Sequence, residues 1–404
     1  MKFPRPYSFV CVALLLAFAG VVRATSPTDC SGNGILYPDE DHCECFQCFD
    51  GPSCQDSLTN CTINAGGGNP AVFQDYWWYH DATTVTPSWY RPEYQIDLPW
   101  FPGKTAPGIG EELRNEILML HQSVGNVETK GYSIVLGSGC THLIAAASSA
   151  LASVHRNATV FAKAPYYDGY ASWAELGVYG MSFSKSLDLE DSDGIIEFVT
   201  TPNNPTGEHR QAHYHLSHVV GDMVYNWPSL TNVTDHADWD IMMFSLSKLS
   251  GHAGTRMGWA LVKDPKVASL MEHFIGTNQI HISIDAQWRT LHILKAINSK
   301  NGDFFHWAQR KMAQRWSDVL ALFEESATAT ASSSFVLHSV PGQFYLWIQC
   351  LESNDCAGVF AKAGLQGWAG SLFGVDDSFV RIELMEHDKV FALILEKLKQ
   401  VLTE

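Results

Sequence analysis

Short apolar runs alternate along most of the chain with segments in which apolar residues recur at helical spacing. The runs predict strands buried on both faces, and the spaced segments predict amphipathic helices. The predicted strands span 132–136, 159–162, 195–199, 219–225, 241–245 and 257–262, and the two clearest helices span 107–124 and 143–151. This alternation favours an α/β fold with a mostly parallel sheet, whose functional side chains gather where the strands end.

The pattern changes at about Gln287. A long helical tract over 288–323 is followed by a stretch rich in Ser, Ala and Thr, and then by strands at 335–338 and 344–349. A separate group of helices and strands of this kind is typical of a second domain. We therefore expect a large domain over 106–290 and a smaller C-terminal αβ domain over 291–404.

Residues 1–24 have the pattern of a secretory signal peptide. Lys2 and Arg5 form a basic start, an apolar core spans 9–19, and Val22-Arg23-Ala24 offers a cleavage site. No other segment approaches 18 uninterrupted apolar residues. We therefore expect no membrane-spanning segment once the signal has been removed.

Composition limits the partners of the chain. Its 404 residues carry a formal net charge of −17, and like charge disfavours nucleic acid and anionic membranes as partners. A hydrophobic content of 46% with 13 Trp is typical of a packed enzyme. Possible N-glycosylation sites are Asn60, Asn157 and Asn232. They agree with the secretory pathway, whether extracellular space, ER lumen or vacuole.

Six of the ten cysteines crowd into one short region: Cys30, Cys43, Cys45, Cys48, Cys54 and Cys61. A segment this small cannot build its own core, so we interpret 25–64 as a disulfide-rich module from an oxidising compartment. Spacing alone leaves the connectivity open, and Cys45-x-x-Cys48 keeps zinc ligation as an alternative. Cys350 and Cys356 are close enough for a local bridge. Gly66-Gly67-Gly68 marks the module boundary, and an aromatic arm extends over 65–105.

The most informative stretch follows the predicted strand at 241–245. Lys248 lies there among hydroxyl-bearing and small residues, with Arg256 eight positions on. A lysine amine can bind the aldehyde of pyridoxal 5′-phosphate (PLP) once its pKa is lowered. Ser245, Ser247 and Arg256 can donate hydrogen bonds to the dianionic phosphate. The alternative is a solvated loop with an incidental cation pair.

A second motif, Gly137-Ser138-Gly139-Cys140-Thr141, lies between a predicted strand and a predicted helix. This order exposes backbone N–H groups to an anion at the positive end of the helix. The Gly-x-Gly is weak evidence alone, but together with Lys248 and Arg256 it predicts a phosphate site.

Other candidates lie at the ends of neighbouring strands. Asp222 and Tyr225, both placed on the strand at 219–225, can keep the pyridine nitrogen protonated and bind the 3-oxygen of the ring. Asn204 can donate to that oxygen, and the pair Tyr166-Tyr167 can stack on the ring. Each has a structural alternative as a buried carboxylate, a turn amide or a core tyrosine.

The order of these motifs resembles that of fold-type I PLP enzymes of the aspartate aminotransferase superfamily. The stretch from Ser247 to Asp264 is similar to the alliinase family, which also contains the tryptophan aminotransferase-related proteins of plants. Cys30 to Cys61 resembles the EGF-like module that precedes the alliinase domain in secreted members. The resemblance implies a large domain with a seven-stranded sheet, a small C-terminal domain and PLP as cofactor, with no metal.

The resemblance also implies residue roles. Lys248 would hold the cofactor and move the substrate α-proton, and Arg381 would bind the α-carboxylate. Tyr94 matches a tyrosine that reaches the phosphate of the neighbouring subunit, which implies a homodimer with shared sites. The phosphate ligands would be Gly139, Cys140, Thr141, Ser245 and Arg256. The disulfides would be Cys30–Cys43, Cys45–Cys54, Cys48–Cys61 and Cys350–Cys356.

One segment departs from the family. Ala65-Gly66-Gly67-Gly68-Asn69-Pro70 stands where members more often have an acidic Gly-Asp pair. The region borders the substrate pocket in the family, so the departure concerns specificity and not cofactor binding.

Three functions are compatible with the sequence. The first is an aminotransferase that converts L-tryptophan or a similar L-amino acid to its 2-oxo acid. The second is a C–S lyase of the alliin lyase type, which cleaves S-alkyl-L-cysteine sulfoxides to 2-aminoacrylate and a sulfenic acid. Both need the same lysine and the same electron sink, so no residue type separates them. The third is a secreted binding protein without catalysis.

Overall fold

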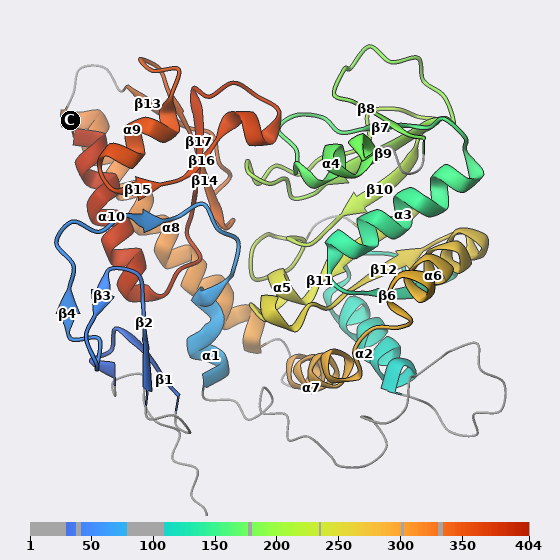
Figure 1. Ribbon diagram of the computed structural model, residues 1–404, viewed down its shortest axis with the longest axis horizontal. Coiled ribbons are helices and arrows are strands. Elements are labelled where there is room, and N and C mark those ends of the chain that lie inside the picture. Colours follow the sequence, from blue (N-terminus) through green and yellow to red (C-terminus); the bar gives the residue numbers. More distant parts are fainter. Residues whose placement is uncertain are drawn as a thin grey trace, which may run out of the picture.

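The computed structural model describes residues 30–37, 42–78, 109–176, 180–233, 236–299, 303–329 and 334–403. Figure 1 shows a small cysteine-rich segment, a large sheet with its helices, and a second sheet with helices near the C-terminus. This is the α/β architecture that the alternating pattern predicted. The predicted signal peptide and Tyr94 lie outside the described residues. Within these ranges, no helix is both long enough and apolar enough to cross a membrane.

Two short antiparallel ladders and three disulfides form the cysteine-rich segment. β1 (Gly34–Tyr37) pairs with β2 (His42–Cys45), and β3 (Phe49–Asp50) pairs with β4 (Asp56–Ser57). The bridges are Cys30–Cys43, Cys45–Cys54 and Cys48–Cys61, the pairs that the family resemblance implied. Cys45 and Cys48 enter different bridges, so the zinc alternative is wrong. These bridges restrict the unfolded chain and stabilise a segment with little core.

The cysteine-rich segment packs against the C-terminal part of the chain. Its last strand, β5 (Ile63–Asn64), pairs in parallel with β15 (Leu365–Gln366), and Ile63 is fully buried. Gln47 Nε2 donates to Glu386 Oε1 over 2.8 Å. Phe46 stacks on His387 with ring centroids 3.8 Å apart. The segment is therefore integrated into the fold through backbone and side-chain contacts.

The large sheet has seven strands in the order β6-β12-β11-β10-β9-β7-β8. All neighbouring pairs are parallel except those made by β12, which runs antiparallel to both β6 and β11. The bounds are β6 (Ser133–Gly137), β7 (Thr159–Phe161), β8 (Ser182–Ser184), β9 (Ile195–Thr200), β10 (His218–Asp222), β11 (Ile241–Ser245) and β12 (Gly258–Val262). β9, β11 and β12 are buried at every residue, which explains the apolar runs of β11 and β12. β9 also buries Glu197, whose carboxylate accepts from His213 N and Tyr214 N.

One strand is shorter than the sequence predicted. We expected a strand over 219–225 that would carry both Asp222 and Tyr225, but β10 ends at Asp222. Tyr225 lies in the loop that follows, where the backbone turns and Asn226 N donates to Met223 O. The apolar residues of this loop are buried by tertiary packing, so burial alone does not reveal where the strand ends.

Helices pack on the large sheet and on one another. α3 contacts β6, β11 and β12 and packs against α6, while α2 packs against α7. Buried His121 of α2 accepts a hydrogen bond from Trp259 Nε1 of β12 over 2.9 Å. The bounds are α2 (Ile109–Val124), α3 (Cys140–Val154), α4 (Gly169–Glu175), α5 (Leu246–Leu249), η4 (Ala253–Thr255), α6 (Pro265–Gln279) and α7 (Ile284–Ser299). The predicted tract over 288–323 falls in two helices, α7 and α8 (Asp303–Ala329).

The second sheet is antiparallel, in the order β13-β14-β17-β16. α10 packs against α8, and α9 contacts β17. The Cys350–Cys356 bridge joins the end of β14 to the start of α9. The bounds are β13 (Phe335–Leu337), β14 (Tyr345–Cys350), α9 (Cys356–Lys362), β16 (Trp368–Ala369), η5 (Gly370–Phe373), β17 (Phe379–Glu383) and α10 (Asp388–Thr403).

A short aromatic segment, η2 (Ala71–Phe73) and α1 (Gln74–Trp78), lies between the two sheets. The ring of Phe304 in α8 contacts Phe73, Tyr76 and Trp77. Trp77 Nε1 donates to Ser250 O over 2.8 Å, just after α5. This segment therefore ties the α5 region to the helices of the second sheet.

Candidate functional site

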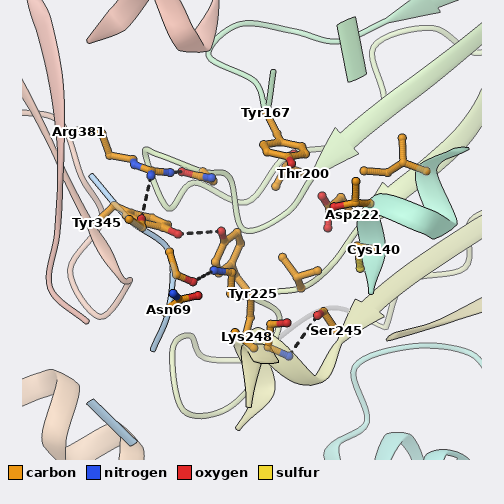
Figure 2. Close-up of a pocket in the computed structure, with 18 of the residues that line it drawn as sticks. Asn69, Cys140, Tyr167, Thr200, Asp222, Tyr225, Ser245, Lys248, Tyr345 and Arg381 are labelled. Atoms are coloured by element: carbon orange, nitrogen blue, oxygen red, sulfur yellow. Dashed lines mark hydrogen bonds between the residues drawn. The ribbon is translucent and has the colours of Figure 1, made fainter. Parts of the chain in front are cut away.

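A cavity lies between the carboxyl ends of the central strands and the second sheet, and most of the predicted site residues line it (Figure 2). Predicted residues in its wall are Cys140, Thr141, Tyr167, Asn204, Asp222, Tyr225, Ser245, Lys248, Arg256 and Arg381. Gly139 lies against Arg256 at its edge. The topology explains this convergence, because parallel strands end at one edge of a sheet.

Lys248 lies in α5, which begins directly after β11. Ser245 starts this turn: its hydroxyl accepts from Ser247 N over 3.2 Å and caps the helix. The Lys248 amine points into the cavity and donates to Gly68 O. The site lysine is therefore held at a buried strand end by a capped turn and a backbone carbonyl.

The phosphate loop combines a helix start with a guanidinium. Gly139 has φ +78°, a conformation that favours glycine, and α3 begins at the next residue. A Cβ atom at Gly139 would lie 2.7 Å from Arg256 Nη2, so a side chain here would displace the guanidinium from its place beside the loop. Backbone N–H groups at a helix start, an arginine and hydroxyls together suit a phosphate dianion.

Asp222 is 5% exposed at the end of β10. Its Oδ2 accepts from Tyr170 Oη over 2.7 Å, and its buried Oδ1 has no partner in the described part of the chain. Burial raises the pKa of Asp222 to about 6, while hydrogen bonds from Tyr170 and Val224 N and the charge of Lys248 oppose the shift. An unpartnered acceptor in the cavity wall suits the protonated nitrogen of a pyridine ring.

Two tyrosines border the same space. Tyr167 follows β7 and presents its ring to the cavity (Figure 2). Tyr225 is buried, and its hydroxyl lies 3.2 Å from the hydroxyl of Tyr345, a residue of β14 that the sequence analysis missed. Tyr166 of the predicted pair is directed elsewhere, against Phe183 and Gly374.

Arg381 is 2% exposed on β17 and reaches into the cavity from the second sheet. Nη1 donates to Asn204 Oδ1 over 3.0 Å, and Nη2 donates to Gly66 O and Gly67 O over 2.6 and 3.0 Å. Its Nε has no partner in the described residues. These contacts occupy three of the five guanidinium N–H groups and fix the plane, so that Nε and the remaining N–H of Nη1 can still donate to a carboxylate.

An aromatic cage surrounds this guanidinium. Its central carbon lies 4.1 Å from the ring centroid of Tyr345 and 4.3 Å from that of Trp368. Trp368 also covers Gly66, where a Cβ atom would lie 2.1 Å from Trp368 Cδ1. Gly66-Gly67-Gly68, which the sequence marked as a module boundary and the family resemblance placed beside the substrate pocket, contributes Gly67 and Gly68 to the cavity wall.

Glu383 is a buried carboxylate two residues from Arg381 that sequence analysis also missed. It is 2% exposed, its Oε2 has no partner among the described residues, and Gly67 covers its carboxyl group. Burial, followed by the neighbouring Glu386, raises the pKa of Glu383 to about 8, against the opposing charges of Arg381 and Lys248. The alternation of β17 was the available signal, since residues 381 and 383 share a face.

Comparison with solved structures identifies the fold. An aminotransferase from Staphylococcus aureus superimposes with a TM-score of 0.63 at 17% identity, covering 84% of this chain and 94% of that one. An aspartate aminotransferase from Thermus thermophilus gives 0.60 at 16% identity, covering 85% and 92%. The chain thus has the fold-type I architecture of aminotransferases, with an N-terminal disulfide-rich segment added.

Sequence comparison identifies the family. The allinase (alliinase) family profile matches residues 63–402, so the chain belongs to the alliinase family. Tryptophan aminotransferase-related protein 1 of Oryza sativa is 33% identical, over 86% of this chain and 84% of its own length. Tryptophan aminotransferase-related protein 3 of Arabidopsis thaliana is 30% identical, over 95% and 89%. Alliin lyase of Allium cepa var. aggregatum is 29% identical, over 95% and 93%.

Members of the alliinase family and fold-type I aminotransferases use PLP. The residues of this cavity fit that group: an amine for its aldehyde, an anion site for its phosphate, and the unpartnered Oδ1 of Asp222 for its ring nitrogen. This orphaned acceptor is the most direct structural sign of a site for a cationic N–H partner.

Glu383→Gln should alter how stability depends on pH. Because the pKa of Glu383 is raised in the folded state, from 4.5 to about 8, folding takes up a proton between these values. Its contribution to the free energy of unfolding is therefore complete below pH 4.5 and is lost as pH rises to 8, at up to about 1.4 kcal/mol per pH unit. Glu383→Gln should not lose stability over this pH range in this way.

Urea unfolding of both apoproteins at pH 5, 6.5 and 8 measures the effect. The free energy of unfolding of Glu383→Gln should increase relative to that of the wild type as pH rises. Exposed Glu352 offers the control substitution Glu352→Gln, which should leave the wild-type pH dependence unchanged. Parallel pH profiles for wild type and Glu383→Gln would contradict the assignment of a raised pKa.

Proposed function

We propose that this protein is an aminotransferase that uses PLP to convert L-tryptophan or a similar L-amino acid to its 2-oxo acid. The observation that carries the proposal is that Lys248 from the large sheet and Arg381 from the second sheet line one cavity. A carboxylate site and an amine in one cavity suit an α-amino acid. The similarity to tryptophan aminotransferase-related proteins supports the reaction type.

The residues of the chain would divide the work as follows. Arg381, held by Asn204 Oδ1, would bind and orient the substrate α-carboxylate, and Lys248 would move the proton at the substrate α-carbon. Asp222 would hold the proton on the ring nitrogen, and Asn204 and Tyr225 would donate to the ring oxygen. When bound, PLP supplies a ring that accepts the electron pair left by a broken bond at the α-carbon.

The second candidate is a C–S lyase that acts on S-alkyl-L-cysteine sulfoxides. The similarity to alliin lyase over 95% of this chain, which includes the cysteine-rich segment, supports it. The same residues serve both reactions until the α-proton has been removed. A lyase would then let the β-sulfur group leave the substrate, whereas an aminotransferase would keep the β-substituent and release the 2-oxo acid.

We also propose a homodimer in which Tyr94 of one subunit completes the phosphate site of the other. The basis is the family resemblance, and Tyr94 lies outside the described residues. The disulfides support passage through the secretory pathway. Asn60, Asn157 and Asn232 are exposed, as attachment of a glycan requires, and their glycosylation stays a prediction.

Substrate assays separate the two reactions. Purified protein loaded with PLP is incubated with L-tryptophan and a 2-oxo acid, and separately with an S-alkyl-L-cysteine sulfoxide. An aminotransferase should form the 2-oxo acid of tryptophan and release no pyruvate from the sulfoxide. Pyruvate and ammonia from the sulfoxide alone would establish the lyase. Lys248→Ala is the inactive control, and a colourless protein that cannot be loaded with PLP would favour the non-catalytic binding protein.

Arg381→Ala should weaken amino-acid binding by roughly 2–5 kcal/mol, because the substrate carboxylate loses a buried charged partner. The absorption spectrum of the bound cofactor should change little, since the phosphate and ring contacts remain. Spectral titration with the amino acid measures the dissociation constant. Exposed Arg310→Ala is the matched control. Wild-type affinity in Arg381→Ala would place the carboxylate elsewhere, with Arg91 the next candidate.

Mixed dimers test the shared site. Tyr94→Phe should impair activity, because one charge-assisted hydrogen bond to phosphate is worth about 1.5–3 kcal/mol. Refolding this variant together with Lys248→Ala should restore about a quarter of wild-type activity, since half of random dimers are mixed and each carries one intact site. If light scattering confirms that the refolded protein is dimeric but the mixture shows no recovery of activity, the shared site is contradicted.

A further inference from the structure

Two loops bring Tyr167 and Asn204 to the cavity. One follows β7 and the other follows β9, and these parallel strands are neighbours in the large sheet. Tyr167 lies in the cavity wall, and Asn204 accepts from the Arg381 guanidinium. The position of one loop relative to the other therefore affects both the contact of Tyr167 with the cofactor ring and the orientation of Arg381, which would bind the substrate carboxylate.

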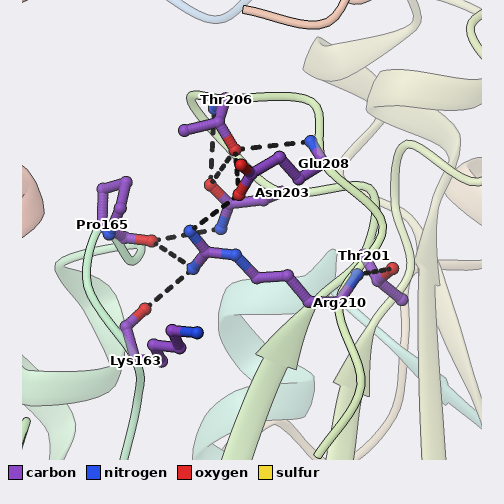
Figure 3. A network of polar contacts seen from close by, with 7 residues as sticks. All are labelled: Lys163, Pro165, Thr201, Asn203, Thr206, Glu208 and Arg210. Carbon is purple, nitrogen blue, oxygen red and sulfur yellow. Dashed lines mark hydrogen bonds and ion pairs between the residues drawn. The ribbon is translucent and has the colours of Figure 1, made fainter. Parts of the chain in front are cut away.

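Arg210 joins these two loops (Figure 3). Its Nη1 donates to Lys163 O over 2.9 Å and to Pro165 O over 2.8 Å, both in the loop after β7. Its own backbone N donates to Thr201 Oγ1 over 3.0 Å, at the start of the loop after β9. Arg210 thus ties the two loops together: its backbone N is bound to the segment that carries Asn204, and its side chain holds the backbone just before Tyr167.

Asn203, the neighbour of Asn204, completes the link. Its Nδ2 donates to Pro165 O over 3.1 Å, so two donors converge on the same carbonyl. Its Oδ1 accepts from Thr206 Oγ1 over 3.0 Å, and its backbone N donates to Glu208 O over 2.7 Å. The amide is therefore held on both sides and cannot turn away while these contacts persist.

Arg210 acts from outside the site. Its side chain is 13% exposed, and it lines a separate cleft with Lys163, Tyr166 and Glu208. Its ion pair with Glu208 is long, at 3.5 Å, and Glu208 is exposed, so this pair contributes little. The two carbonyl contacts are the important ones, because backbone oxygens fix where the loop lies.

We propose that Arg210 is a positioning residue, which sets the relative placement of Tyr167 and Asn204 and thereby the fit of cofactor and substrate. The inference deepens the proposed function and rests on it. The guanidinium is suited to this task, because its planar donors reach two carbonyls from one side chain and keep their charge at any physiological pH.

The test compares wild type, Arg210→Ala and the exposed control Arg156→Ala. PLP affinity is measured by equilibrium dialysis, ring geometry by visible circular dichroism of the bound cofactor, and turnover with the substrate found for the wild type. Arg210→Ala should bind PLP about tenfold more weakly, lose much of its visible dichroism and lower kcat/KM by about tenfold to a hundredfold, as expected for misplaced reacting groups. Arg156→Ala should match the wild type.

Rescue distinguishes positioning from general stabilisation. Ethylguanidinium at low millimolar concentration should enter the space that the Arg210→Ala substitution opens in the cleft and restore dichroism and PLP affinity, whereas tetramethylammonium should not. A variant with a lower melting temperature but wild-type dichroism, PLP affinity and kcat/KM would overturn the inference. If Arg210→Ala does not fold, Arg210→Lys, which keeps the charge but loses the planar fork, is compared by the same criteria.

These outcomes are separable from failure of the proposed function. A wild-type protein that does not bind PLP would contradict the proposed function itself. A wild-type protein that binds PLP, beside an Arg210 variant that binds it equally well and turns over at the same rate, would contradict only the positioning role.

Discussion

Backbone carbonyl oxygens of residues 66–68 hold both Lys248 and Arg381, the two cations that face each other across the cavity. A carbonyl oxygen orients each of these side chains without placing a full negative charge beside it. Burial acts in the same direction at Glu383, because it raises the pKa of this carboxyl group to about 8 and so favours its neutral form near pH 7. A chain with a net charge of −17 can therefore present a locally positive site to an anionic cofactor and a carboxylate.

Much of the large sheet and its half of the site could be predicted because the signals are local. Buried strands appear as apolar runs, and the polar residues that follow them meet because parallel strands end at one edge. Lys248 and Asp222 were accessible in this way. The cysteine pairs were not, since spacing alone allowed many connectivities, and they came from the family resemblance.

The other half of the site depends on tertiary packing that no local pattern encodes. Tyr345 and Trp368 reach Arg381 only through the register of the second sheet and its placement against the first. Tyr225 was placed on a strand because its loop is as apolar as the strand before it. Arg210 carried no signal at all, since its partners are backbone oxygens, which every residue possesses.

The contact between Gly66 and Trp368 has a consequence for how this site can change. Any side chain at position 66 would collide with the indole, and a smaller residue at 368 would uncover both the glycine and one face of Arg381. The two positions lie near opposite ends of the chain, yet they are coupled through this contact. A side chain at position 66 can be accommodated only if the indole, which is 40% exposed, moves away from Arg381 or if residue 368 changes as well.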